Sequence, residues 1–149
     1  MARLLAGEGA RVDGELSWLD ALPRGEGVRV AATLAPADAD LRYAPQRVAL
    51  GVGCSRGCPP GELAALVEEA LAEAGVAPEA LAAVGTLDLK ADEGAVAGLA
   101  RTLGVPLRLF DAAALEALAP RLATPSATVF AEVGCHGVAE GAALALAGP

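Results

Sequence analysis

Short apolar segments alternate with helical segments from Arg47 onward, and this alternation limits the possible folds more than any other feature of the sequence. Three apolar runs have the length of buried strands: Arg47–Gly53, Val84–Leu87 and Pro106–Phe110. The first expected helical segments are a helix at Glu62–Ala74, a short turn at Pro78–Ala83 and a helix that Asp92 caps and Gly104 closes. The next expected helix is Ala112–Leu118, which Asp111 caps. The last two are a helix that begins with Thr124-Pro125-Ser126 and ends at Val133, and a helix at Val138–Ala147. Strands that alternate with helices at this spacing predict an α/β fold with a largely parallel sheet.

Residues 1–46 lack this regular pattern. The pattern there predicts only a short helix at Leu16–Leu22, a strand at Val28–Leu34 and a turn at Pro36–Asp40. We therefore expect residues 1–46 to form a weakly structured, linker-like segment, followed by one domain at residues 47–149.

Charge and hydropathy exclude several classes of function. The 149 residues carry a net charge of −8, which argues against non-specific binding to nucleic acid or to an anionic membrane surface. No stretch approaches the ~18 uncharged apolar residues of a membrane-spanning helix, and the first residues lack the apolar core of a signal peptide. The three cysteines are an odd number, which argues against a disulfide framework. We therefore expect a cytoplasmic protein that binds neither nucleic acid nor membranes.

A glycine-rich turn, GVGCSRG, links the first expected strand to the helix that follows it. At such a position, backbone N–H groups and a helix N-terminus can hold an anion, and Arg56 would add a planar guanidinium. The turn has neither the Gly-Lys-Ser/Thr of a Walker loop nor the spacing of G-x-G-x-x-G, so a turn that needs glycines for its geometry alone is the alternative. The candidate binding residues are Gly51, Gly53, Cys54, Arg56 and Gly57.

A second polar segment, TLDLKADE, follows the next expected strand and contains Asp88, Lys90, Asp92 and Glu93. Open α/β sheets place their ligand crevices at the carboxyl ends of the strands. Lys90, the only lysine, is a candidate anion anchor or a member of a proton-transfer network, and the alternative is a solvated turn in which Asp92 only caps the next helix. Because neighbouring parallel strands end at the same edge, we expect Arg56 and Lys90 to face one cleft.

The cysteines and the single histidine allow two interpretations each. Cys54 and Cys58 have a spacing that zinc sites accept, but Cys135 and His136 are adjacent and must point in different directions. We expect the cysteines to be small apolar fillers and no metal to be bound. His136 lies in a glycine-containing loop and is a candidate general acid or base, with a merely polar surface residue as the alternative.

Five motifs in order, GVGCSRG, TLDLKADE, GVPLRLFDAAAL, TPSATVF and VGCHGVAEGAAL, resemble the CobE/CbiG C-terminal domain family of cobalamin biosynthesis. The resemblance covers about residues 47–149. It implies a three-layer α/β/α fold and a role in handling corrin precursors. CbiG proteins open the lactone ring of cobalt-precorrin-5A and release acetaldehyde, whereas CobE proteins belong to the oxygen-dependent route. Family members usually continue with a further strand, so the resemblance implies a sheet without the family's last strand.

The resemblance also implies site residues. The family's glycine-rich loop, polar strand end and Pro-Ser turn fall on the candidates already given and on Pro125 and Ser126. Its late motif falls on Val133, Gly134, Gly137, Val138 and Glu140. Tetrapyrrole precursors carry many carboxylates, which suits Arg56, Lys90 and backbone N–H groups as anchors. The family assigns no catalytic residue to transfer, and Asp88, Lys90 and His136 are the candidates. No cofactor is expected, and cobalt, where present, belongs to the substrate.

The favoured hypothesis is a cobalamin biosynthesis protein that binds a polycarboxylate tetrapyrrole precursor as part of a cobalt-precorrin-5A lactone hydrolase. Its expected partners are a corrin intermediate and other enzymes or fused domains of the cobalamin pathway. The alternatives are a non-catalytic corrinoid carrier or interaction module, and an unrelated anion-binding α/β domain. Activity on the lactone separates the first hypothesis from the second, and tetrapyrrole absorbance on the purified protein separates both from the third.

Overall fold

The computed structural model describes residues 10–14 and 28–148. The chain divides into two compact units. The first takes in the residues up to 46 together with 71–80, and the second consists of residues 47–70 and 81–149. This division places most of the predicted domain in the second unit.

The second unit is built on a sheet of three parallel strands in the order β4-β5-β6. These strands are β4 (Val48–Gly51), β5 (Leu81–Leu87) and β6 (Leu107–Phe110). The central strand, β5, is buried along almost its whole length because it has a neighbour on each side and helices on both faces. The predicted parallel sheet is confirmed, although β5 begins three residues earlier than the apolar pattern indicated.

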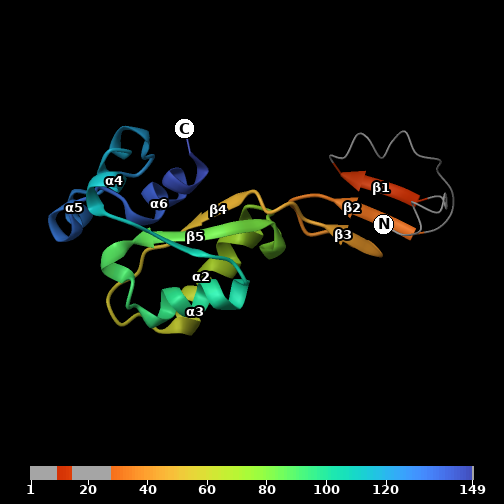
Figure 1. Cartoon of the computed structure of the whole chain (residues 1–149), viewed down its shortest axis with the longest axis horizontal. Coiled ribbons are helices and arrows are strands. Elements are labelled where there is room, and N and C mark those ends of the chain that lie inside the picture. The colour runs from red at the N-terminus through yellow and green to blue at the C-terminus, as the bar shows by residue number, and fades with distance from the viewer. Residues whose placement is uncertain (1–9, 15–27, 149) are drawn as a thin grey trace. The chain divides into compact units, whose positions relative to one another are not determined.

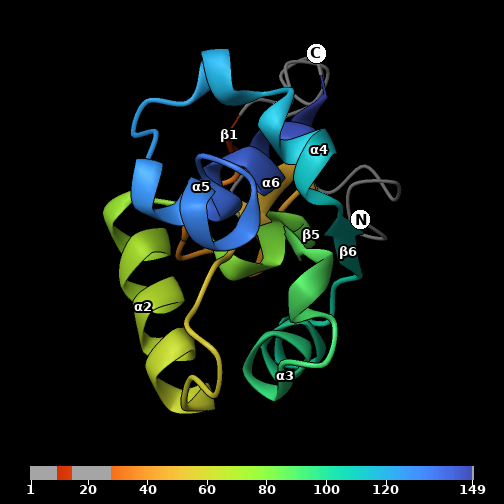
Figure 2. The same ribbon diagram turned by 90° about the vertical axis from the view of Figure 1, so that its left-hand side faces the viewer.

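Helices cover both faces of this sheet and give the three-layer α/β/α arrangement (Figure 1 and Figure 2). The helices are α2 (Pro60–Glu73), α3 (Gly94–Leu103), α4 (Ala112–Glu116), α5 (Ala127–Val133) and α6 (Val138–Ala147), with 3-10 turns η2 (Pro78–Ala80), η3 (Asp88–Lys90) and η4 (Ala119–Arg121). The connection from β4 to β5 contains α2, the connection from β5 to β6 contains α3, and both lead in the same direction across the sheet. Because such connections are almost always right-handed, α2 and α3 lie on the same face of the sheet, and α4, α5 and α6 lie on the other face. Within the described ranges no single helix is long and apolar enough to cross a membrane, and only α5 and α6 together reach that length and composition, with a bend of 82° between them.

Glycines on two neighbouring strands let α6 lie directly on the sheet. A Cβ atom at Gly51 would collide with the Ala139 carbonyl oxygen and lie 2.6 Å from the Ala143 nitrogen. A Cβ atom at Gly85 would lie 2.8 Å from Leu146 Cδ1. Beside this contact is a buried cluster of Leu87, Leu115, Cys135 and Ala142. Cys135 is therefore an apolar filler, as expected, and its burial raises the pKa of its thiol.

Two of the predicted helix caps are confirmed and one is wrong. Asp111 Oδ1 accepts a hydrogen bond of 2.7 Å from the Ala114 N–H, and Gly104 closes α3 with a φ of 67°. The predicted Asp92 cap is absent, because the chain continues from η3 far enough to place Glu93 at the N-cap of α3. The Glu93 side chain does not cap the helix either, since its carboxylate binds the N–H of Gly57.

The first unit contains a second parallel sheet, of order β1-β2-β3. Its strands are β1 (Ala10–Gly14), β2 (Val28–Ala32) and β3 (Leu41–Tyr43). The structure thus differs from the weakly structured segment that the sequence predicted, and the expected strand at Val28–Leu34 is its central strand. β3 escaped prediction because all three of its residues are exposed and show no alternation. The helix expected at Leu16–Leu22 lies outside the described residues.

Candidate functional site

A cleft of about 680 Å³ lies at the carboxyl ends of β4 and β5. The loop after β4 and the η3 turn after β5 form one wall, and α5 with the first turn of α6 forms the other. The lining residues are Gly53, Cys54, Ser55, Arg56, Leu89, Lys90, Val129, Glu132, Val133, Val138 and Ala139. Parallel strands end at one edge of a sheet, and this brings the two predicted polar motifs together.

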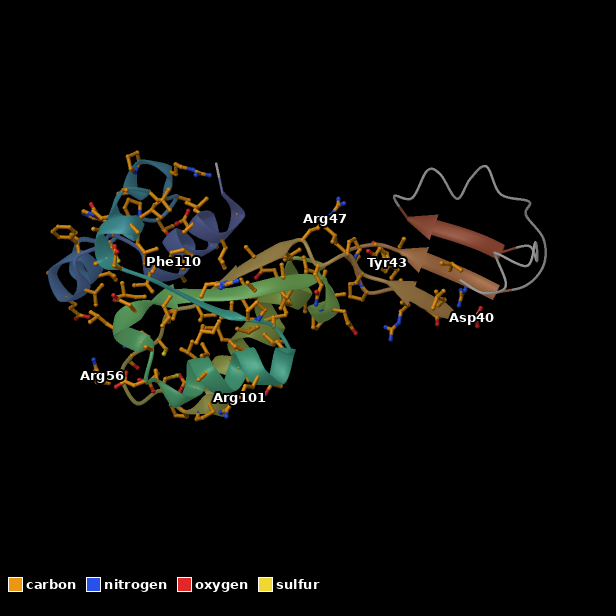
Figure 3. All side chains as sticks on the ribbon, in the orientation of Figure 1. Asp40, Tyr43, Arg47, Arg56, Arg101 and Phe110 are labelled. Carbon is orange, nitrogen blue, oxygen red and sulfur yellow. The ribbon has the colours of Figure 1, made fainter. Side chains whose placement is uncertain are left out.

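Arg56 and Lys90 both line this cleft, as their positions after neighbouring strands predicted. Arg56 is exposed and extends from the loop away from the ribbon, as Figure 3 shows. Lys90 is partly buried on η3. Neither cation forms a salt bridge with a carboxylate of the described ranges. The cleft therefore offers two positive charges that are available to an anionic ligand.

The glycine-rich loop is fixed to the second polar motif by one hydrogen bond. The Gly57 N–H donates to Glu93 Oε2 at 3.1 Å. Gly57 has a φ of 73°, a left-handed conformation that glycine adopts without strain. Gly53 lines the cleft, where a Cβ atom would lie 3.4 Å from Val138 Cβ. The loop thus has a defined shape before any ligand binds.

Other residues predicted for the site lie elsewhere. Gly51 is outside the cleft lining, against the backbone of α6, so its lack of a side chain serves helix packing. Asp88 and Asp92 are exposed and are also absent from the lining. Of the polar strand-end motif, Lys90 alone brings a charged side chain into the cleft, while Glu93 supports the glycine loop.

Cys54 places a thiol in the cleft beside the two cations. Burial raises the pKa of this thiol, and the neighbouring Cys58 raises it further, while Lys90 opposes the shift. The side chain is therefore a neutral thiol at neutral pH. Within residues 10–14 and 28–148, no three side chains suited to metal binding gather at one place.

Ser126 and His136 also lie outside the cleft lining, and both are hydrogen-bonded within the helices. Ser126 caps α5, since its Oγ accepts from the Val129 N–H at 3.3 Å, and its own N–H donates to the His136 carbonyl oxygen at 2.8 Å. His136 Nδ1 lies 2.9 Å from Glu116 Oε1, and its backbone N–H donates to Glu116 Oε2 at 2.9 Å. The ring stacks on Phe130 with a centroid distance of 4.5 Å. These hydrogen bonds from His136 lower the pKa of Glu116.

Glu140 completes this set of contacts. Its carboxylate accepts from the Ala123 N–H at 2.6 Å and from the Thr124 N–H at 3.3 Å. The hydrogen bond from Ala123, with those from Thr124, lowers the pKa of Glu140. The Pro-Ser turn and the late glycine motif therefore hold α4, α5 and α6 together, and we call these three helices with their connections (residues 112–147) the helical cover.

Sequence reasoning missed the wall that the helical cover contributes to the cleft. Val129, Glu132 and Val133 recur at i, i+3 and i+4 and so share one face of α5. Glu132 is the only charged residue in that helix. This spacing was visible in the sequence, but the position of the face against two distant loops was not.

A second cavity, of about 460 Å³, lies within the first unit. It is lined by residues around β2 and β3, among them Asp40 and Tyr43, and by Ala77–Glu79. None of the predicted site residues lines it.

Comparison with protein families and curated proteins gives consistent matches. The profile of the family described as Cobalamin synthesis G C-terminus matches residues 48–149. Protein CobE of Sinorhizobium sp is 57% identical over 99 residues, which are 66% of this chain and 64% of that protein. Cobalt-precorrin-5A hydrolase of Priestia megaterium is 32% identical over 106 residues, which are 71% of this chain and 28% of the hydrolase. The chain thus spans less than two thirds of the length of these relatives.

Solved structures share the fold. The crystal structure of CobE, a protein of the cobalamin biosynthetic pathway, matches with a TM-score of 0.62 and 43% identity over 66% of this chain and 69% of that chain. A cobalamin biosynthesis protein G homologue from Sulfolobus solfataricus matches with a TM-score of 0.53 over 97% of this chain and 44% of that chain. At 19% identity the second match shows a shared fold alone.

Proposed function

Because the chain belongs to the CobE/CbiG family of cobalamin biosynthesis proteins, we propose that its cleft binds a polycarboxylate tetrapyrrole precursor of the corrin ring. The observation that carries this proposal is the pair of cations, Arg56 and Lys90, in one cleft at the strand ends. A guanidinium and an ammonium form charge-assisted hydrogen bonds with carboxylates. The two groups leave different strands, so they suit two carboxylates on one edge of a large ligand.

The rest of the cleft suits the body of such a ligand. Leu89, Val129, Val133 and Val138 supply apolar surface for the face of a macrocycle. Leu89 is 51% exposed, so its side chain is accessible to a ligand in the cleft. The cleft volume also falls in the range of about 300–1,000 Å³ that small-molecule pockets occupy.

For the wider role, we propose that this binding serves cobalt-precorrin-5A hydrolysis within a larger protein or assembly of the pathway, in the cytoplasm. The matched region makes up 28% of the Priestia hydrolase, so other domains would supply part of that site. Lys90 is the one catalytic candidate of the sequence analysis that lines the cleft, which makes it the residue of choice for a proton-transfer role. A non-catalytic carrier would use the same two cations without turnover.

Titration with a carboxylate-bearing corrin such as cobyrinic acid, followed by absorbance, tests the binding proposal. A charge-assisted hydrogen bond contributes about 1.5–3 kcal/mol, so Arg56→Ala or Lys90→Ala should weaken binding roughly tenfold to a hundredfold. Arg101→Ala is the matched control, because Arg101 lies on α3 and is exposed outside the cleft (Figure 3). Equal affinity in the wild type, Arg56→Ala and Lys90→Ala would reject the proposal. Turnover of the lactone by the full protein would separate the hydrolase from the carrier.

A further inference from the structure

Two hydrogen bonds join the ends of the glycine-rich loop to the end of β5 and the segment that follows it. At the start of the loop, the buried Thr86 Oγ1 donates to the Val52 carbonyl oxygen at 2.8 Å. At the end of the loop, Glu93 Oε2 accepts from the Gly57 N–H at 3.1 Å. The loop residues between these two contacts, Arg56 among them, all line the cleft. The hydrogen bonds therefore bracket the part of the loop that faces a ligand.

Glu93 also contacts the segment that carries the second cation. Its backbone N–H donates to the Lys90 carbonyl oxygen at 3.0 Å. Its side chain holds Gly57, the residue directly after Arg56. Glu93 therefore connects the two cation-bearing segments through one main-chain and one side-chain hydrogen bond.

The side chain of Glu93 does not serve the helix that begins beside it. Glu93 occupies the N-cap of α3 but forms no side-chain cap hydrogen bond. Aspartate, asparagine, serine and threonine are the preferred residues there, because their short side chains reach back to the first N–H groups of the helix. The longer glutamate side chain reaches the loop instead. The choice of a glutamate at this position is explained by the contact with the loop and not by the helix.

We infer that Glu93 is a positioning residue of the cleft, which sets the spacing of Arg56 and Lys90 by holding their two segments together. This inference rests on the proposed function, since a ligand pairs two carboxylates with the two cations at once only where the spacings match. A loop that is held before binding also loses less conformational entropy when Arg56 meets a carboxylate. Glu93 thus contributes to affinity without touching the ligand.

Two substitutions separate the reach of the side chain from its charge. Glu93→Asp keeps the charge and shortens the side chain by one methylene group, so that the carboxylate no longer reaches the Gly57 N–H. Glu93→Gln removes the charge and keeps an acceptor oxygen at the same length. In absorbance titrations with cobyrinic acid, Glu93→Asp should bind about threefold to tenfold more weakly than the wild type, because the loop must then be ordered on binding. Glu93→Gln should bind at least as tightly as the wild type, because the contact remains and a negative charge beside the cations is lost.

The dependence on Arg56 separates positioning from a general effect on the fold. In an Arg56→Ala background no guanidinium is left to position, so Glu93→Asp should change the affinity by less than about twofold. The melting temperature of Glu93→Asp should equal that of the wild type, since aspartate is a preferred N-cap residue for α3. Glu69→Asp is the matched control, because Glu69 is exposed on α2 outside the cleft. It should change the affinity by less than about twofold in either background.

The outcomes distinguish the inference from the proposed function. Suppose that Arg56→Ala weakens binding but Glu93→Asp binds as the wild type does, or loses as much affinity in the Arg56→Ala background as in the wild type. The proposed function then stands and the inference is overturned. Binding by Glu93→Gln as weak as that by Glu93→Asp overturns it as well, since the charge would matter and the reach would not. If Arg56→Ala and Lys90→Ala both bind cobyrinic acid as the wild type does, the proposed function fails and the inference fails with it.

Discussion

The strand-end loops and the helical cover are both rich in polar residues, but they use them differently. In the helical cover, Glu116 binds His136, Glu140 binds the Ala123–Thr124 backbone, and Ser126 caps α5. In the loops, Arg56 and Lys90 have no carboxylate partner among the residues described.

The difference teaches how to separate structural from ligand-binding polar residues in one domain. A polar group whose hydrogen-bonding capacity is used within the protein stabilises the fold, and a ligand would have to break existing bonds to reach it. A charged group in a cleft without a protein partner gives up only its hydrogen bonds to water when a ligand binds. By this criterion the late glycine motif is structural, and the proposed site consists of residues from the two loops and one face of α5.

Gly51 gives the largest expected effect, and it separates packing from ligand binding within the glycine-rich loop itself. Gly51→Ala places a Cβ atom against the backbone of α6, which cannot move aside as a flexible side chain could. We expect a loss of about 3 kcal/mol in the free energy of unfolding, the upper end for overpacking. Chemical denaturation measures this loss.

Gly61→Ala is the control for that experiment. A Cβ atom at Gly61 meets nothing within 4 Å, and the residue lies in α2, where alanine is favoured by up to about 1 kcal/mol. Stability should be unchanged or slightly higher. A Gly51→Ala protein as stable as the wild type would show that α6 does not rest on β4 in the manner described.

Ser126 gives a smaller effect of a purely structural kind. Ser126→Ala removes the cap of α5 and should lower the free energy of unfolding by about 1 kcal/mol. The affinity of Ser126→Ala for cobyrinic acid should equal that of the wild type. Arg56→Ala should show the reverse pattern, with weaker binding and an unchanged melting temperature. Thr128→Ala, on the exposed side of the same helix, is the control. Weaker ligand binding by Ser126→Ala at unchanged stability would return this residue to the site.

Glu140 gives the smallest effect, seen in the pH dependence of stability. Hydrogen bonds, first of all from the Ala123 N–H, lower its pKa in the folded state below the ordinary value of about 4.3, so the unfolded state binds the proton more readily. The contribution of Glu140 is fully present above that ordinary value and is lost as the pH falls through the lowered pKa. Chemical denaturation at several pH values should show that the difference in unfolding free energy between the wild type and Glu140→Gln shrinks as the pH falls. Glu69→Gln, at an exposed position of α2, is the control and should show no such trend. A constant difference would contradict the lowered pKa.

Much of the fold was predictable because it depends on local patterns. The three strands of the second unit, the helix Val138–Ala147 and the Asp111 cap follow from apolar periodicity and capping chemistry. The Asp92 cap failed because a 3-10 turn displaced the start of α3, an event that depends on tertiary contacts. The first residues of β5, Leu-Ala-Ala, have little intrinsic preference for a strand and take that form through pairing with β4.

The site was predictable in part, for a related reason. The sequence predicted that Arg56 and Lys90 share one cleft, because their loops follow neighbouring parallel strands, and both residues do line the same cleft. The wall formed by Val129, Glu132 and Val133 required knowledge of where α5 packs, and no local pattern encodes that. The role of Gly51 was misjudged for the same cause, since its close neighbour is Ala139, far along the chain.

The contact between α6 and β4 also bears on how the domain forms during synthesis. The first strand of the sheet is covered by the last helix, so β4 keeps one apolar face exposed until almost the whole domain has left the ribosome. Long-range closure of this kind slows folding and prolongs the time in which strand edges can pair wrongly. We expect a nascent chain stalled before Val138 to leave this face of β4 uncovered.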